Sequence, residues 1–143
     1  MAGQTTQTIR DVMTLKLTTL PVNASVRDAA RAMRDANIGD VLVVNNGNLC
    51  GIVTDRDIVI RALAEGREPA STTLADICSQ ELSTVSPTDS IDHAVQLMRQ
   101  KALRRLPVVE NGHPVGMVSI GDLAQNREPQ SALGDISAAP PNR

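Results

Sequence analysis

An ungapped internal duplication constrains the fold of this chain more than any other feature. When the sequence is compared with itself at an offset of 65 positions, matching residues keep one register over about fifty positions. A unit of this length that occurs only twice indicates two supersecondary units paired about a pseudo-two-fold axis, because a solenoid needs at least three repeats. The matching pairs include Ser25 with Ser90, Met33 with Met98, Asn46-Gly47 with Asn111-Gly112, Gly51 with Gly116, and Asp57 with Asp122.

The duplication also predicts where the repeats begin and end. We place the first repeat at residues 8–66 and the second at 74–126. The linker between them, 67–73, follows Gly66, which is typical of a helix end, and contains a proline among small polar residues. Residues 127–143 combine three prolines with Ser, Ala and Gly, and this composition predicts a flexible tail.

The hydrophobic pattern of the first repeat predicts the order β-α-β-β-α. Residues 18–20 form a short strand, and Ser25 caps a helix that ends near 37–39. Two further strands, 41–44 and 49–54, are joined by Asn46-Gly47, a dipeptide favoured in tight hairpin turns, and a second helix begins near Asp55. The expected buried face of the first helix consists of Val26, Ala29, Ala30 and Met33.

The second repeat follows the same plan. Ser90 caps a helix, and strands 106–109 and 115–119 flank the turn at Asn111-Gly112. Two such repeats predict an α/β (α+β) fold in which helices cover small buried sheets. The expected buried face of its helix consists of Ile91, Ala94, Val95 and Met98.

Composition and charge argue against several classes of function. The chain has 14 basic and 16 acidic residues, so no general positive field attracts nucleic acid, and it has no aromatic residue to stack on a base. No apolar run is long enough to span a membrane, and residues 1–7 form no apolar signal segment. We therefore expect a cytoplasmic protein that binds neither membranes nor nucleic acid.

Cysteine and histidine usage offers no evident catalytic or metal site. Cys50 and Cys78 are far apart in sequence and lack a Cys-x-x-Cys spacing, so we expect reduced core thiols. The alternative is a redox-sensing pair. His93 and His113 have no nucleophile or ligand cluster nearby in sequence, so we expect solvated side chains, no metal site and no enzymatic activity.

One element with polar side chains occurs in both repeats, where a strand runs directly into a helix. Thr54 and Asp57 have the same spacing as Ser119 and Asp122. This spacing is typical of a capping box, in which the hydroxyl accepts from the backbone three residues on and the carboxylate reaches back. It also suits a nucleotide, because the free N–H groups and positive end of a helix favour phosphate, a hydroxyl there adds a donor, and a carboxylate accepts hydrogen bonds from ribose hydroxyls. Both interpretations remain open.

A second feature favours ligand binding. Arg104 and Arg105 directly precede the strand that begins at Leu106, so their guanidinium groups lie where they could donate hydrogen bonds to phosphate oxygens. Pro107 lacks an N–H and therefore indicates a strand start or edge. The alternative for the two arginines is ordinary solvated surface charge.

With these residues in place, the chain resembles the CBS-domain family, whose tandem repeats form a Bateman module. The resemblance covers nearly all of residues 9–123. It rests on Asp11-Val12-Met13, the Gly-x-Val-Thr/Ser-x-x-Asp element in both repeats, Arg104 to Val109, and the two Asn-Gly turns. The stretch 54–61, with Gly66 and Pro69 after it, is similar to the small stand-alone actinobacterial members of the hypoxic-response type.

The resemblance implies a regulatory module that binds AMP, ADP, ATP or S-adenosylmethionine in clefts between the repeats, needs no cofactor and forms a homodimeric disc. It implies phosphate and ribose contacts from the two hydroxyl and carboxylate pairs, and phosphate neutralisation by the arginines. The first repeat has Gly39-Asp40-Val41-Leu42 where the second has Arg-Arg-Leu-Pro, so the two sites should differ. The implied ligand-binding residues are Thr19, Asp40, Val41, Thr54 and Asp57 in the first repeat, and Thr84, Arg104, Arg105, Leu106, Pro107, Ser119 and Asp122 in the second.

Three functional hypotheses follow. The first is a non-catalytic sensor of energy or stress state that binds an adenine nucleotide. The second is a ligand-free dimeric interaction or stress-response protein, in which the repeated motifs serve only as helix caps. The third, an enzyme, lacks a candidate nucleophile and base.

Overall fold

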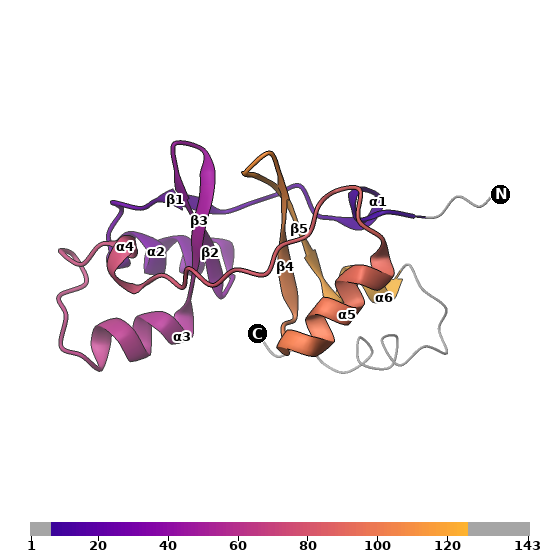
Figure 1. The fold of residues 1–143 in the computed structure, drawn as a ribbon. Helices are drawn as coiled ribbons and strands as arrows, with labels where there is room; N and C mark the ends of the chain where they lie inside the picture. Colours follow the sequence, from indigo (N-terminus) through magenta and orange to yellow (C-terminus); the bar gives the residue numbers. More distant parts are fainter. Residues whose placement is uncertain (1–6, 126–143) are drawn as a thin grey trace. The chain divides into compact units, whose positions relative to one another are not determined.

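The computed structural model describes residues 7–125 and divides into two compact units (Figure 1). The continuous unit is formed by Thr18–Leu82, and the split unit combines residues 7–17 with residues 83–125. The tail predicted at 127–143 lies outside the described residues. Among the described residues, no helix is long and apolar enough to cross a membrane.

The continuous unit has the predicted β-α-β-β-α order. Its three-stranded sheet has the order β1-β2-β3, with β1 parallel and β3 antiparallel to β2. The second predicted helix begins at Asp55, but it becomes a π-helix after its first turn. The elements are β1 (Thr19–Pro21), α2 (Val26–Ala36), β2 (Asp40–Asn45), β3 (Asn48–Thr54), α3 (Asp55–Asp57), the π-helix Ile58–Leu63 and α4 (Leu74–Ile77).

The split unit repeats this plan with a smaller sheet. Strands β4 and β5 form an antiparallel pair, and where β1 would lie, Val85 makes only a single parallel bridge to Val108. The helices cover this pair as the hydrophobic pattern predicts. The elements are α1 (Ile9–Val12), α5 (Ile91–Lys101), β4 (Arg105–Glu110), β5 (His113–Ser119) and α6 (Ile120–Gln125).

A single proline accounts for part of the difference between the two sheets. In the continuous unit, the backbone N–H of Leu42 donates to the carbonyl of Thr18 at 3.0 Å. Pro107 occupies the equivalent position on β4 and has no N–H, so this bond cannot form in the split unit. The proline therefore marks an edge of the sheet, as its chemistry predicts.

The two units exchange their leading segments. Helix α1 begins the first sequence repeat, yet Ile9 and Val12 are buried in the core of the split unit with the second repeat. Helix α4 begins the second sequence repeat, yet Leu74 and Ile77 are buried in the continuous unit. The bounds 8–66, 67–73 and 74–126 remain a prediction about the sequence repeats, and the packing units differ from them at these two segments.

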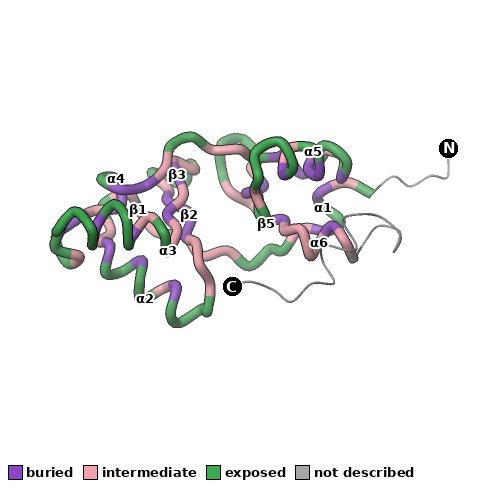
Figure 2. Tube along the Cα trace, turned by 90° about the horizontal axis from the view of Figure 1, so that it is seen from below, coloured by how far each residue is buried: buried purple, intermediate pink, exposed green. Residues whose placement is uncertain are grey.

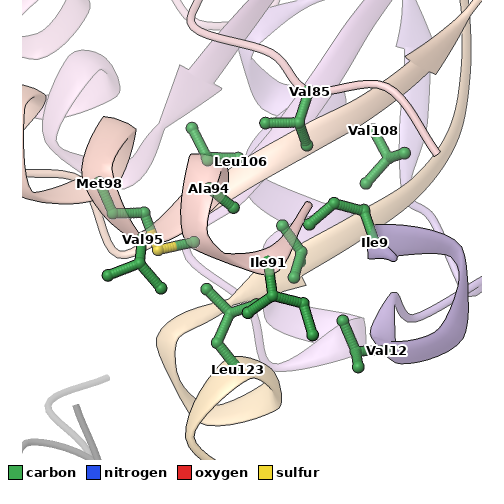
Figure 3. Close-up of a cluster of buried hydrophobic side chains, with 11 residues drawn as sticks. Ile9, Val12, Val85, Ile91, Ala94, Val95, Met98, Leu106, Val108 and Leu123 are labelled. Atoms are coloured by element: carbon green, nitrogen blue, oxygen red, sulfur yellow. The ribbon is translucent and has the colours of Figure 1, made fainter. Parts of the chain in front are cut away.

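Each unit has its own aliphatic core. In the split unit, side chains from α1, α5, β4 and α6 converge (Figure 3), and the predicted face of α5 is buried throughout. Along α2, buried positions alternate with exposed ones (Figure 2). The prediction for α2 was wrong at Ala30, which is exposed because the buried face centres on Val26, Ala29 and Met33, and Ala32 packs at its edge instead.

Candidate functional site

In the continuous unit, the candidate residues gather at one end of the sheet. Asp40, the first residue of β2, is the register partner of Thr54, the last residue of β3. Thr19 begins the neighbouring strand β1 and pairs with Leu42. Asp57 follows Thr54 by three residues, on α3. The fold therefore brings these four of the five predicted residues to one end of the sheet.

The split unit reproduces this arrangement. Arg105, the first residue of β4, is the register partner of Ser119, the last residue of β5. The N–H of Ile120 donates to the carbonyl of Arg104 at 2.9 Å, as the N–H of Asp55 donates to the carbonyl of Gly39 at 3.0 Å. Exposed Thr84 lies directly before the bridging residue Val85.

The capping interpretation is correct in both units. The hydroxyl of Thr54 accepts from the N–H of Asp57 at 3.0 Å, and Oδ2 of Asp57 accepts from the N–H of Thr54 at 2.9 Å. The corresponding bonds between Ser119 and Asp122 measure 3.1 and 3.0 Å. In the cap, each hydroxyl accepts through one of its lone pairs, and a carboxylate offers about four acceptor sites in all. Capping therefore does not preclude a ligand contact.

In the continuous unit, the carboxylate has a cationic neighbour that sequence reasoning missed. Nε of Arg61 lies 3.8 Å from Oδ1 of Asp57, whose side chain is only 17% exposed. The same guanidinium donates through Nη1 to the carbonyl of Ile77 at 3.2 Å. The spacing of four residues on a helix is the signal that could have identified this pair. Arg61 therefore holds positive charge beside the candidate carboxylate.

Some of the predicted site residues cannot offer their side chains to a ligand. Val41 and Leu106 are fully buried, and Pro107 is also buried. Only their backbone remains for a ligand contact. The exposed predicted residues are Thr19, Thr84, Arg104 and Arg105.

The two candidate sites carry opposite charge at equivalent places. In the split unit, Arg104 and Arg105 stand at the start of β4. In the continuous unit, Gly39 and Asp40 take these positions, and exposed Asp55 follows Thr54. A phosphate group is therefore better accommodated in the split unit.

The described residues provide no evident metal site. No group of three or more His, Cys, Asp or Glu side chains within residues 7–125 is arranged to hold a metal ion. His93 and His113 are exposed, as predicted, and Nε2 of His93 lies 3.8 Å from Oδ2 of Asp89.

Comparison with known proteins decides the family. The pattern of the CBS domain matches the chain twice, at residues 9–63 and 74–128. The chain belongs to the CBS-domain family. The CBS domain-containing protein YhcV of Bacillus subtilis is 39% identical over 126 residues, which cover 88% of this chain and 89% of YhcV.

The resemblance of this CBS pair to the hypoxic-response type is also confirmed. Hypoxic response protein 1 of Mycobacterium tuberculosis is 32% identical over 120 residues, which cover 83% of this chain and 84% of that protein. A crystal structure of Hypoxic Response Protein I with two coordinated zinc ions has a TM-score of 0.78 and 31% identity, over 85% of this chain and 99% of that one.

One solved relative contains adenosyl ligands. The CBS domain pair of protein MJ0100, solved in complex with 5′-methylthioadenosine and S-adenosyl-L-methionine, has a TM-score of 0.72 and 26% identity. The match covers 84% of this chain and 94% of that one. At least one relative with this fold thus binds adenosyl compounds.

Proposed function

We propose that this chain is a non-catalytic regulatory module that binds AMP, ADP, ATP or S-adenosylmethionine. One observation carries the proposal: Ser119, which forms a cap with Asp122, pairs across the sheet with the cationic Arg105. This places a hydroxyl, a carboxylate and a guanidinium within one unit. The adenosyl ligands of the MJ0100 pair support the class of ligand.

Each side chain in the split unit has a role that suits its chemistry. The hydroxyl of Ser119 can donate to a phosphate oxygen, and Asp122 can accept from ribose hydroxyls, because a carboxylate has about four acceptor sites. Arg104 and Arg105 neutralise the phosphate charge with guanidinium donors. The backbone near Thr84, Leu106 and Pro107 lines the adenine base.

The site in the continuous unit favours a ligand with less negative charge. Asp40 and Asp55 stand near Thr54 and repel a polyphosphate. Arg61 compensates the charge of Asp57 alone, because it lies against that carboxylate. We assign this site, lined also by Thr19 and the backbone of Val41, to a monophosphate or to S-adenosylmethionine, whose sulfonium is cationic.

Homodimer formation is part of the proposal. Val59, Ile60 and Leu63 lie on one helical segment and are 52%, 50% and 55% exposed. Large apolar side chains grouped in this way indicate a surface that another chain covers. We propose that a second copy of this chain covers it.

A ligand-free dimeric stress-response protein is the second candidate function. The completed caps favour it, because Thr54 with Asp57 and Ser119 with Asp122 are explained by folding alone. Under this alternative, removing the carboxylate charge changes no ligand response.

Calorimetric titration with AMP, ADP, ATP and S-adenosylmethionine separates the two candidates. Asp122→Asn removes the charge but keeps an oxygen for the cap, so we expect weaker binding in a folded protein. Asp28→Asn is the matched control, because Asp28 completes an equivalent capping box with Ser25 on α2. Heat from at least one ligand, reduced by Asp122→Asn and not by Asp28→Asn, supports the sensor. Titrations without heat for all four ligands, or equal effects of both variants, overturn it.

A further inference from the structure

Cys78 lies directly against the strand that carries Cys50. A Cβ atom added at Gly51, the neighbour of Cys50 on β3, would stand 2.9 Å from Sγ of Cys78. The absence of a side chain at Gly51 is what allows this close approach. Backbone bonds between Ile52 and Ser79, at 3.0 and 3.2 Å, hold the two segments together.

The position of Cys50 on β3 is irregular. The register between β2 and β3 shifts here, with Gly51 opposite Val43 and Leu49 opposite Val44, so Cys50 is the extra residue of a bulge. Bulges redirect side chains from the regular alternation of a strand. Cys50 is half-buried, and its Sγ lies 3.5 Å from the carbonyl oxygen of Asn48.

The nearby Cys50 also affects the ionisation of Cys78. Burial raises the pKa of Cys78, and the neighbouring Cys50 raises that pKa further. The buried Cys78 is therefore the poorer first nucleophile, while the half-buried Cys50 is open to solvent. In the split unit, Val115 and Met13 occupy the equivalent positions, so the repeated fold does not require cysteines here.

We propose that Cys50 and Cys78 form a redox-sensitive pair that closes into an intramolecular disulfide. The thiolate of Cys50 attacks a hydroperoxide, forming an S–O bond as the O–O bond breaks, and the hydroxide or alkoxide that leaves takes up a proton to become water or an alcohol. The thiolate of Cys78 then attacks the sulfenic sulfur, forming the S–S bond and releasing hydroxide, which a proton converts to water. The two thiols lose two electrons to the peroxide, and a dithiol reductant reverses the change.

Peptide mapping without reduction tests the pair. The reduced full-length chain is treated with hydrogen peroxide, digested and analysed by mass spectrometry. We expect a linked peptide that contains Cys50 and Cys78 and lacks two hydrogen atoms, and that dithiothreitol separates. The linked peptide should be absent from Cys50→Val, which introduces the residue found at the equivalent position, and from Cys78→Ala.

The wild-type chain alone can also give results that contradict the pair, independently of the two variants. Recovery of both cysteines as free thiols overturns the proposal. So does oxidation of Cys50 beyond the sulfenic state while Cys78 stays reduced, and so does a disulfide found only between chains.

Discussion

Arg105 and Ser119 are register partners across β4 and β5, and Asp40 and Thr54 hold the equivalent places across β2 and β3. The hydroxyl of the candidate site is thus repeated in both units, while the charge opposite it is reversed. Under the proposed function, this difference predicts two sites of related geometry and unlike ligand preference.

Reversing the charge at position 105 should weaken the binding of ATP. Arg105→Asp places the first-repeat residue in the split unit, and we expect the affinity for ATP to fall about tenfold or more, because a charge-assisted hydrogen bond is replaced by repulsion. Calorimetry at low and high salt measures the loss. Arg99→Asp on α5 is the control for net charge alone, and an equal loss in that variant would contradict a direct role for Arg105.

The two hydroxyls should also contribute to stability as helix caps. We expect Thr54→Ala and Ser119→Ala each to lower the free energy of unfolding by about 1 kcal/mol. Ser25→Ala removes the equivalent cap of α2 and sets the scale. Urea unfolding measures all three variants. An unchanged free energy of unfolding in either site variant would show that its cap does not contribute to stability.

Most of the fold could be predicted from the sequence because its signals are local. The Asn-Gly turns require positive φ at both residues, and the structure has 54° and 83° at Asn46 and Gly47 and again at Asn111 and Gly112. The caps at Ser25 and Ser90 were also predictable from residue type.

The exchange of leading segments could not be predicted in this way. Helices α1 and α4 have four residues each, too few to show a repeating hydrophobic pattern. Only tertiary packing decides which core their side chains join. The pairing of Arg61 with Asp57 could have been predicted from their spacing of four residues on a helix, whereas the contact of Cys78 with Gly51 needed the fold itself.

Restoring the missing donor on β4 should extend the smaller sheet. Pro107→Leu introduces the residue of the equivalent position and an N–H able to bond to the carbonyl of Ser83, as Leu42 bonds to Thr18. We expect this new amide to be protected from hydrogen exchange. Rapid exchange at residue 107 in a folded variant would show that another feature limits the sheet.

The raised pKa of Cys78 predicts a loss of stability in alkali. Its neutral thiol contributes stability that is fully present below the ordinary thiol pKa and is lost as pH rises through the raised pKa of the folded state. Urea unfolding under reducing conditions should therefore show a steeper alkaline decline for the wild type than for Cys78→Ala. An equal alkaline loss of stability in the two proteins would show that ionisation of Cys78 is not its cause.

The exposed apolar face should control assembly. Ile60→Glu places a charge among Val59 and Leu63, so we expect the homodimer to dissociate. Light scattering after size exclusion measures the mass. Leu15→Glu, at an isolated exposed leucine, is the control that should leave the mass unchanged. A wild type that is monomeric at all concentrations would contradict the dimer.

The most direct test of the account is an NMR titration of the wild-type chain with each of AMP, ADP, ATP and S-adenosylmethionine. If the hydroxyl and carboxylate pairs hold an adenosyl ligand, at least one of the four shifts the amide signals of Ser119 and Asp122, or of Thr54 and Asp57, with saturation, while those of Ser25 and Asp28 stay in place. Spectra unchanged by all four ligands, or shifts confined to residues away from both pairs, would contradict the central claim.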